Sequence, residues 1–288
     1  MNIIVNFAPT GMIPTKEMSP HVPISVNEIV EDVHEACEIG ITMVHLHARE
    51  ERTGNPTYKG KIYRDIIEKI RKFASDLVVC VSLSGRMFME FEKRSEPLHL
   101  DGCLKPDMGS LTLSSLNFNR QESINPPELI HSLAKEMKHR GILPELEAFD
   151  TGMINYAKYL EKKKLIEPPH YFNLILGNIA CAQADLLHAG LMINDLPPDS
   201  YWSLGGVGNA QLIVNTLSII YGGGVRIGLE DNIWFDQGRN MLARNADLLR
   251  RIHTIVDLHA RKIMTSRELR GLLKLQSGDG LYGRAYSK

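Results

Sequence analysis

Short runs of hydrophobic residues alternate along the chain with longer segments in which hydrophobic positions recur at a helical period. The short runs favour strands, because each is brief and bounded by turn-forming residues. The predicted strands are Ile3–Phe7, Met43–His47, Leu77–Leu83, Lys105–Leu111, Pro144–Phe149, Tyr171–Leu176, Trp202–Val207 and Val225–Leu229. The predicted helices between them include Ser25–Glu38, Tyr63–Phe73, Pro127–His139, Gln211–Ile220 and Gly238–His259.

This alternation predicts an α/β protein folded as a (β/α)8 TIM barrel, with the helices outside the strands. Helix boundaries agree, since Ser25 and Glu28 form a capping-box pattern before the first helix. No linker divides the chain, so residues 1–288 are expected to form a single barrel domain with a C-terminal helix at 265–274. An open, doubly wound sheet is the alternative, but its usual glycine fingerprint does not follow the first strand.

Composition and charge exclude several classes of partner. The 288 residues are 43% hydrophobic, enough for a sizeable core, and 33 Lys and Arg nearly balance 34 Asp and Glu. Because no run of like charge occurs, neither nucleic acid nor a membrane is an expected partner. The chain start lacks a basic signal-type region, and no segment approaches the roughly 20 apolar residues of a membrane span, so we expect a cytoplasmic protein. Four widely spaced cysteines indicate reduced thiols: Cys37, Cys80, Cys103 and Cys181.

Two histidines, His45 and His47, alternate at the end of the second predicted strand. Because strand side chains alternate between faces, both rings are expected to point into the barrel, near the carboxyl end where TIM barrels place their active sites. A pair of neutral imidazoles suits Zn²⁺ or another borderline metal ion. Histidines held by hydrogen bonds to the backbone are the alternative, so a metal site needs a third ligand.

A carboxylate after the last predicted strand is the best candidate for that ligand. The segment 222–232, GGGVRIGLEDN, brings Arg226, Glu230 and Asp231 to the same rim, because the eighth strand of a barrel closes beside the first. Glu230 would complete a set of two histidines and one glutamate, with positions open for water and substrate. A solvated loop is the alternative interpretation of these charges taken alone.

Two further strands carry candidate substrate contacts. The apolar strand near Cys80 is followed by Ser82 and Gly85, where a substrate could approach the hydroxyl and the backbone closely. On a later strand Glu145 and Glu147 share a face, so an inward carboxylate must be paired or functional. A role for Glu145 is favoured over one for Glu147, and pairing with a buried base such as Arg49 is the alternative.

Several motifs together resemble the β-keto acid cleavage enzyme family, and the similarity runs over nearly the whole chain. They are HLHAR at 45–49, SLSG at 82–85, KPDM at 105–108, PELE at 144–147 and VRIGLEDN at 225–232. The resemblance implies a zinc-dependent TIM barrel that condenses a β-keto acid with acetyl-CoA and cleaves the adduct to acetoacetate and a new acyl-CoA. It also implies a homo-oligomer, often a homotetramer.

The resemblance also implies roles for residues at matching positions. The implied metal ligands are His45, His47 and Glu230. The implied catalytic residues are Asp231, Arg226 and Ser82. In this scheme the aspartate, oriented by the arginine, removes a proton from the substrate to give a carbon nucleophile. The expected substrate contacts are Thr10, Gly85, Ser110 and Glu145.

Three positions depart from the family pattern. Ile13 stands where members that act on an amino substrate carry an acidic residue, so Met12 and Ile13 are expected to suit an apolar or neutral substrate tail. An amine stays open as an alternative because Glu145 remains and Glu17 is close in sequence. Ser110 replaces a more usual Thr, and Glu50 replaces a more usual Asp.

The CoA site and the reaction class leave alternatives. A glycine-rich turn at 205–209 precedes a helix and could face a phosphate, and Arg86 is another candidate. A metal-dependent aldolase or hydrolase acting without CoA is the alternative function, and a requirement for acetyl-CoA would separate the two. Amidohydrolase-type enzymes carry the histidine pair on the first strand instead of the second. A non-catalytic barrel would leave the metal-ligand set without purpose.

Overall fold

Eight parallel strands close into a barrel in the computed structural model of the protein, which describes residues 2–285. The order around the barrel is β1-β12-β11-β10-β9-β6-β5-β2, and β1 also pairs with β2 to complete the circle. The strands are β1 (Val5–Phe7), β2 (Met43–Leu46), β5 (Val78–Val81), β6 (Met108–Thr112), β9 (Leu143–Ala148), β10 (His170–Leu176), β11 (Ser200–Gly206) and β12 (Gly224–Ile227). The predicted TIM barrel is confirmed.

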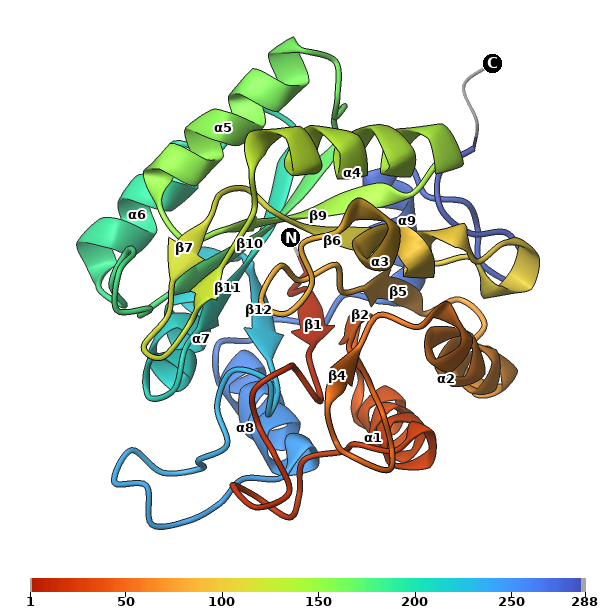
Figure 1. Ribbon diagram of the computed structural model, residues 1–288. Helices are drawn as coiled ribbons and strands as arrows, with labels where there is room; N and C mark the ends of the chain where they lie inside the picture. The colour runs from red at the N-terminus through yellow and green to blue at the C-terminus, as the bar shows by residue number, and fades with distance from the viewer. Residues whose placement is uncertain (1, 286–288) are drawn as a thin grey trace.

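Helices cover the outside of the barrel (Figure 1). They are α1 (Val26–Ile39), α2 (Gly60–Phe73), α3 (Phe91–Ser95), α4 (Pro127–Arg140), α5 (Thr151–Lys162), α6 (Leu186–Asn194), α7 (Ala210–Tyr221), α8 (Asn245–Leu258) and α9 (Ser266–Leu273), with short 3₁₀ helices η1 (Glu96–His99) and η2 (Gly102–Leu104). The Ser25 hydroxyl accepts from the Glu28 N–H at 3.2 Å and the Glu28 carboxylate accepts from the Ser25 N–H at 2.9 Å, which is a capping box. Across residues 2–285 no helix has the length and apolar character needed to cross a membrane.

Some elements end or begin away from the predicted residue because a side chain takes over a backbone hydrogen bond. β5 stops at Val81, before the predicted end at Leu83, since the Leu83 N–H donates to Ser110 Oγ at 3.0 Å. α8 starts later than predicted because the Asp236 carboxylate accepts from the Asn240 N–H at 2.9 Å and folds the preceding segment into a turn.

Hydrophobic side chains and α9 close the amino-terminal end of the barrel. The cluster consists of Ile4, Met43, Val78, Cys80, Met108, Leu143 and Tyr171 with Met264, Leu269, Leu273 and Leu275 from the C-terminal segment. Arg270 holds α9 in place, because its Nη1 and Nη2 donate to the two carboxylate oxygens of Asp107 at 2.8 and 2.9 Å. Both side chains are buried, so this end of the barrel is a packed floor.

Two short hairpins stand on the loops at the opposite, carboxyl end of the strands. β3 (Ala48–Arg49) pairs with β4 (Pro56–Thr57) after β2, and β7 (Leu116–Asn117) pairs with β8 (Glu122–Ser123) after β6. Residues of both hairpins line hollows at this end of the barrel. The loops therefore build walls above the strand ends.

Candidate metal centre and active site

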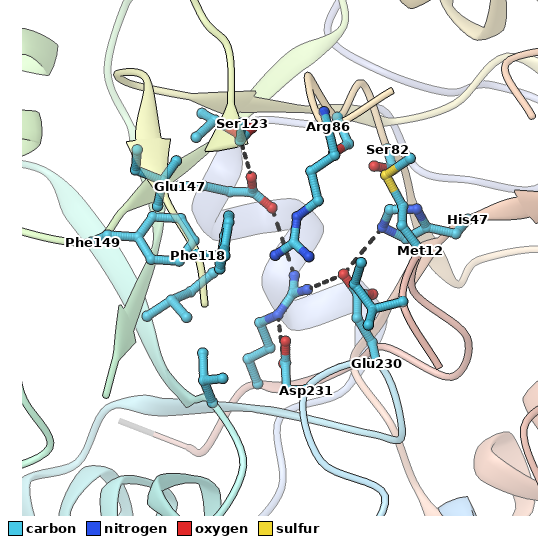
Figure 2. A pocket seen from close by; sticks show the side chains of 17 residues that line it. Met12, His47, Ser82, Arg86, Phe118, Ser123, Glu147, Phe149, Glu230 and Asp231 are labelled. Atoms are coloured by element: carbon cyan, nitrogen blue, oxygen red, sulfur yellow. Dashed lines mark hydrogen bonds and ion pairs between the residues drawn. The ribbon is translucent and has the colours of Figure 1, made fainter. Parts of the chain in front are cut away.

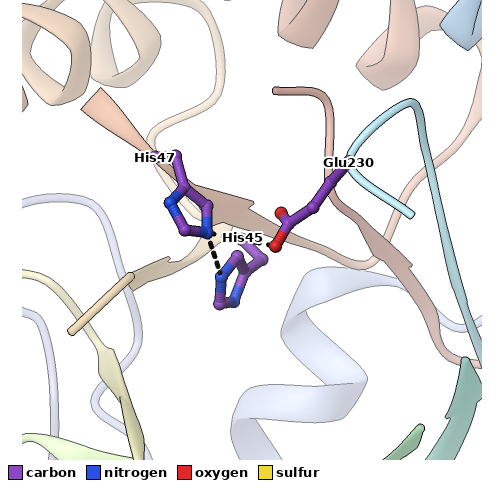
Figure 3. Close-up of side chains that lie close together, drawn as sticks. All are labelled: His45, His47 and Glu230. Atoms are coloured by element: carbon purple, nitrogen blue, oxygen red, sulfur yellow. Dashed lines mark hydrogen bonds and ion pairs between the residues drawn. The ribbon is translucent and has the colours of Figure 1, made fainter. Parts of the chain in front are cut away.

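The side chains of His45, His47 and Glu230 converge at the carboxyl end of the barrel (Figure 3). Nε2 of His45 lies 3.2 Å from Nε2 of His47, and the latter atom lies 3.1 Å from Glu230 Oε1. Strand alternation at the end of β2 turns both rings to the same side. Glu230 follows β12, and Gly11 leaves room for it, since a Cβ at position 11 would lie 2.5 Å from Glu230 Cγ.

This donor set fits a divalent metal ion. Tetrahedral zinc ligands about 2.1 Å from the ion are about 3.4 Å apart, close to the separations observed here. Without a cation the contact between the two rings needs a proton. Burial lowers the pKa of His47 to about 4, whereas Glu145, acting against burial, raises the pKa of His45. Glu230 Oε2 has no hydrogen-bond partner among the described residues. A cation would replace the proton and engage this oxygen.

Glu145 lies behind the ring of His45, away from the cavity. Its Oε2 is 2.5 Å from His45 Nδ1, and its Oε1 accepts from Asn6 Nδ2 at 2.7 Å. Burial would raise the pKa of Glu145, but the His45 ring and then Arg226 hold it at about 2. The ionised carboxylate keeps a proton on Nδ1 of His45 and directs Nε2 toward the metal site. The predicted substrate contact by Glu145 is not supported by this position, because the side chain is fully buried.

Glu145 pairs with a buried base, as the alternative interpretation expected, but the base is His45 and not Arg49. The Arg49 guanidinium donates to the carbonyl oxygens of Gly11, Pro14 and Gly54, each at 2.9 Å. The buried arginine thereby fixes the loop after β1, part of which forms the cavity wall.

Arg226 on β12 binds the carboxylates beside the ligand set. Its Nη2 lies 2.7 Å from Glu230 Oε1, and its Nε donates to Asp231 Oδ2 at 2.9 Å. Burial raises the pKa of Asp231 even beside this guanidinium, whereas Arg226 outweighs burial at Glu230 and holds its pKa well below the usual value. The two neighbouring acids are thus set apart: Glu230 is an ionised ligand, and Asp231 is the more basic carboxylate.

One cavity at the barrel mouth brings these groups together (Figure 2). Figure 2 places His47, Ser82 and Glu230 on one side and Phe118 and Phe149 on the other. The apolar part of the lining consists of Met12, Ile13, Leu116, Phe118, Phe149, Ile175 and Val207. Such a cavity can hold the polar head of a small substrate against the metal ligands while its chain contacts apolar side chains.

Three expected substrate contacts do not line this cavity. Ser110 Oγ accepts the hydrogen bond from the backbone after β5, as described above. Gly85 packs so closely that a Cβ there would lie 2.4 Å from the Ile124 carbonyl oxygen. Thr10 is buried, and its Oγ1 has no hydrogen-bond partner within residues 2–285. This placement does not support direct substrate contact by these residues; Ser110 and Gly85 pack the wall.

Glu147 and Arg86 reach the cavity, although the sequence favoured Glu145. Glu147 lies further along β9, where the barrel opens, and its Oε2 accepts from Thr112 Oγ1 at 2.7 Å. Alternation turns both glutamates into the barrel, and their positions along β9 decide the rest. Glu147, nearer the carboxyl end of the strand, reaches the cavity, whereas Glu145 stays below it. Arg86 stacks on Phe118, with its guanidinium carbon 3.5 Å from the ring centroid.

Two backbone N–H groups of the glycine-rich turn 205–209 donate hydrogen bonds within the protein. The Val207 N–H donates to the Leu176 carbonyl at 3.0 Å, and the Gly208 N–H donates to the Asp231 carbonyl at 2.8 Å. These donors are not free for a phosphate. The turn instead fixes the backbone of Asp231.

Residues 2–275 match the family model described as beta-keto acid cleavage enzyme. The chain belongs to this family. It is 34% identical over 277 residues to 3-keto-5-aminohexanoate cleavage enzyme from Fusobacterium nucleatum, covering 95% of this chain and 98% of the relative. It is also 34% identical to 3-oxoadipate:acetyl-CoA acetyltransferase from Cupriavidus necator, covering 95% of each chain. The barrel is similar to the apo structure of ObcA, with a TM-score of 0.75 at 18% identity over 88% of this chain and 66% of the other, which supports the fold alone.

As a beta-keto acid cleavage enzyme family member, the protein is an enzyme that breaks carbon–carbon bonds. Its departures from the family pattern fall in different places. Ile13 lines the cavity, so this change alters the surface that a substrate meets. Glu50 lies outside the cavity, where its carboxylate pairs with Lys59 Nζ at 2.6 Å. Of these two residues, only Ile13 lies where a ligand in the cavity could contact it.

Proposed function

We propose that the protein is a zinc-dependent enzyme that transfers an acyl group between a β-keto acid and acetyl-CoA. The keto acid R–CO–CH₂–COO⁻ and acetyl-CoA give acetoacetate and R–CO–CoA, so atoms and charge balance without a further reactant. One observation carries the proposal. In a chain of this family, the convergent set His45, His47 and Glu230 lies beside the Arg226–Asp231 pair in a single cavity.

The ligand set would hold Zn²⁺ through Nε2 of His45, Nε2 of His47 and the Glu230 carboxylate. When bound, the ion supplies a Lewis acid for the carboxylate and keto oxygens of the substrate. Glu145 orients His45, and Arg226 keeps Glu230 ionised, so the ligands are prepared before any ion arrives. The same donor types also accept Co²⁺, Mn²⁺ or Fe²⁺.

Asp231 is the proposed base that takes a proton from the methylene carbon between the two carbonyl groups. Arg226 Nε holds one carboxylate oxygen at 2.9 Å, which aims the side chain while burial keeps it basic. The resulting carbon nucleophile attacks the acetyl-CoA carbonyl and displaces the CoA thiolate. The thiolate then attacks the R–CO carbonyl carbon of the adduct, forms R–CO–CoA and expels the acetoacetate carbanion, which takes the proton from Asp231. Ser82 lines the same cavity and is proposed to bind the substrate carboxylate. Deprotonated Asp231 is regenerated when the adduct is cleaved.

Acetoacetate release tests the reaction directly. Zinc-loaded protein should release acetoacetate only when a β-keto acid and acetyl-CoA are both present. Asp231→Asn should keep the zinc and lose turnover, whereas His47→Ala should lose both. Asp247→Asn, a half-exposed aspartate on α8, is the matched control and should retain activity. Keto acid cleavage without acetyl-CoA would instead support the aldolase or hydrolase.

We also propose that the protein forms a homotetramer in the cytoplasm. Support comes from helices that expose large hydrophobic side chains: Leu186, Leu187 and Leu191 on α6, and Ile213, Ile220 and Tyr221 on α7. Exposed apolar residues of this size favour burial against another subunit. The four cysteines are free thiols, which suits a reducing compartment. Light scattering of the purified protein, with Leu187→Lys as the disrupting variant, tests the assembly.

A further inference from the structure

Arg86 presents an unpaired guanidinium to the cavity. Its side chain stacks on Phe118, with 3.5 Å from the guanidinium carbon to the ring centroid. No carboxylate or other hydrogen-bond acceptor in residues 2–285 lies in bonding range of its guanidinium nitrogens. Stacking fixes the plane of the guanidinium and leaves its N–H edge for a ligand. Figure 2 shows this edge pointing into the cavity.

Every carboxylate that lines the cavity already has a partner. Glu230 contacts His47 and Arg226, and Asp231 contacts Arg226. Glu147 accepts from Thr112 and lies 3.8 Å from Arg226 Nη1. The cavity therefore offers no free acid to an ammonium group, whereas it offers a free cation to an anion.

A second donor faces the same space. Arg226 is buried, and its Nη1 makes no hydrogen bond among the described residues, since its ion-pair partner Glu147 Oε1 lies 3.8 Å away. Burial lowers the pKa of Arg86, the carboxylates of Glu230, Asp231 and Glu147 act in the opposite direction, and Arg226 lowers the pKa further. An anion bound between the two guanidinium groups would favour both positive charges. A planar carboxylate matches the fork geometry of a guanidinium.

The position of Arg86 relative to the metal ligands indicates which carboxylate of a bound substrate it would contact. Figure 2 places Arg86 between the side with His47 and Ser82 and the side with Phe118. The proposed function places the first carboxylate of the keto acid at the metal ligands. A group held by Arg86 must then be further along the substrate.

We propose that Arg86 binds a second carboxylate at the far end of the keto acid, so that the substrate is a dicarboxylic β-keto acid. This inference rests on the proposed function and replaces the apolar or neutral tail expected from Met12 and Ile13. Those side chains, with Phe118, then contact the methylene carbons between the two carboxylates. Arg86 becomes the residue that sets tail specificity, with no role assigned to it in the proton transfer.

Steady-state kinetics with three β-keto acids of equal chain length test the role of Arg86 in tail binding. The compounds are 3-oxohexanedioate, 3-oxohexanoate and 6-amino-3-oxohexanoate, which share chain length and differ in tail charge. The wild-type protein should have its highest kcat/KM with the dicarboxylate. Arg86→Gln should lower the ratio of kcat/KM for the anionic tail to that for the neutral tail by at least about 30-fold, because a buried charge pair is lost. Arg120→Gln, an exposed arginine in the loop between β7 and β8, is the control and should leave the ratio unchanged.

Equilibrium binding gives a readout that does not need turnover. In calorimetry with the zinc-loaded protein, hexanedioate should bind at least about tenfold more tightly than hexanoate, and Arg86→Gln should abolish the difference. Equal binding of the two acids would overturn the inference. So would a preference for the neutral or cationic tail, or a raised KM for acetyl-CoA in Arg86→Gln with an unchanged tail ratio.

The two proposals fail in different ways. If no keto acid gives acetoacetate, the proposed function is wrong, and tighter binding of hexanedioate through Arg86 would still support the anion site. If acetoacetate is released with no preference for the dicarboxylate, the proposed function stands and the tail assignment is wrong.

Discussion

The carboxylate of Glu145 lies 2.5 Å from Nδ1 of His45, while Nε2 of the same ring faces His47 at 3.2 Å. One ring thus connects a fully buried acid to the proposed metal site. Glu145 is itself held by the Asn6 amide at 2.7 Å and the Cys80 thiol at 3.2 Å. The orientation of the histidine is therefore set inside the barrel, independently of the surface loops.

Replacing Glu145 with glutamine should weaken zinc binding by about 10- to 100-fold, because a neutral amide orients His45 less firmly and makes its Nε2 a weaker ligand. Chelator competition measures the zinc dissociation constant. Glu161→Gln is the matched control, since Glu161 contacts the buried His170 at 3.1 Å outside the cavity lining. Unchanged zinc affinity in Glu145→Gln would contradict the proposal that Glu145 orients His45 for metal binding.

Zinc should stabilise the folded protein, because the three ligand side chains converge only in the folded state. At a free zinc concentration of about 100 times the dissociation constant, the gain in unfolding free energy is about 2.7 kcal/mol. Thermal unfolding with and without a chelator measures it. His47→Ala should show a much smaller gain, and an equal gain in that variant would place the bound zinc elsewhere.

The fold was predictable from the sequence because its signals are local. Alternating strand and helix periods predict a barrel, and the capping pattern at Ser25 and Glu28 depends on residues three positions apart. The limits of β5 and α8 were not predictable in the same way. They depend on hydrogen bonds from side chains such as Ser110, which lies on another strand.

The candidate site, like the fold, was predictable from local signals and less so where it depends on packing between distant residues. His45 and His47 are readable from alternation, and closure of the barrel brings Glu230 to them. Pairing was harder to predict, since alternation shows that Glu145 points inward but not which base it meets. The depth of a residue along its strand separates Glu145 from Glu147. Only the packed structure shows that the Arg86 guanidinium makes no hydrogen bond or ion pair within residues 2–285.

Arg270 should be essential for stability, because its bidentate contact with Asp107 is buried at 2.8 and 2.9 Å. Arg270→Leu removes the closer of the two arginines that pair with the buried Asp107 carboxylate and leaves Arg71 Nη2 at 3.1 Å, so the change should cost about 3 kcal/mol of unfolding free energy. Arg267→Leu on the same helix is the control: its pair with Asp76 is exposed, and the expected loss is below about 1 kcal/mol. Denaturant titration distinguishes them, and equal losses would show that the buried pair adds nothing specific.

Asp32 should make stability depend on pH in a direction opposite to most acids. Burial raises its folded-state pKa from 3.8 to about 6, against a hydrogen bond from Asn245 Nδ2 at 2.6 Å. The folded state therefore binds a proton more tightly than the unfolded state does. The penalty for ionising Asp32 is absent below about pH 4, grows as the pH rises to about 6, and is complete above it.

Asp32→Asn removes the titration, so its unfolding free energy relative to wild type should increase between pH 4 and pH 6 and then level off. Glu31→Gln, an exposed residue of the same helix, should run parallel to wild type over this range, and a parallel profile for Asp32→Asn as well would show that the folded-state pKa is not raised.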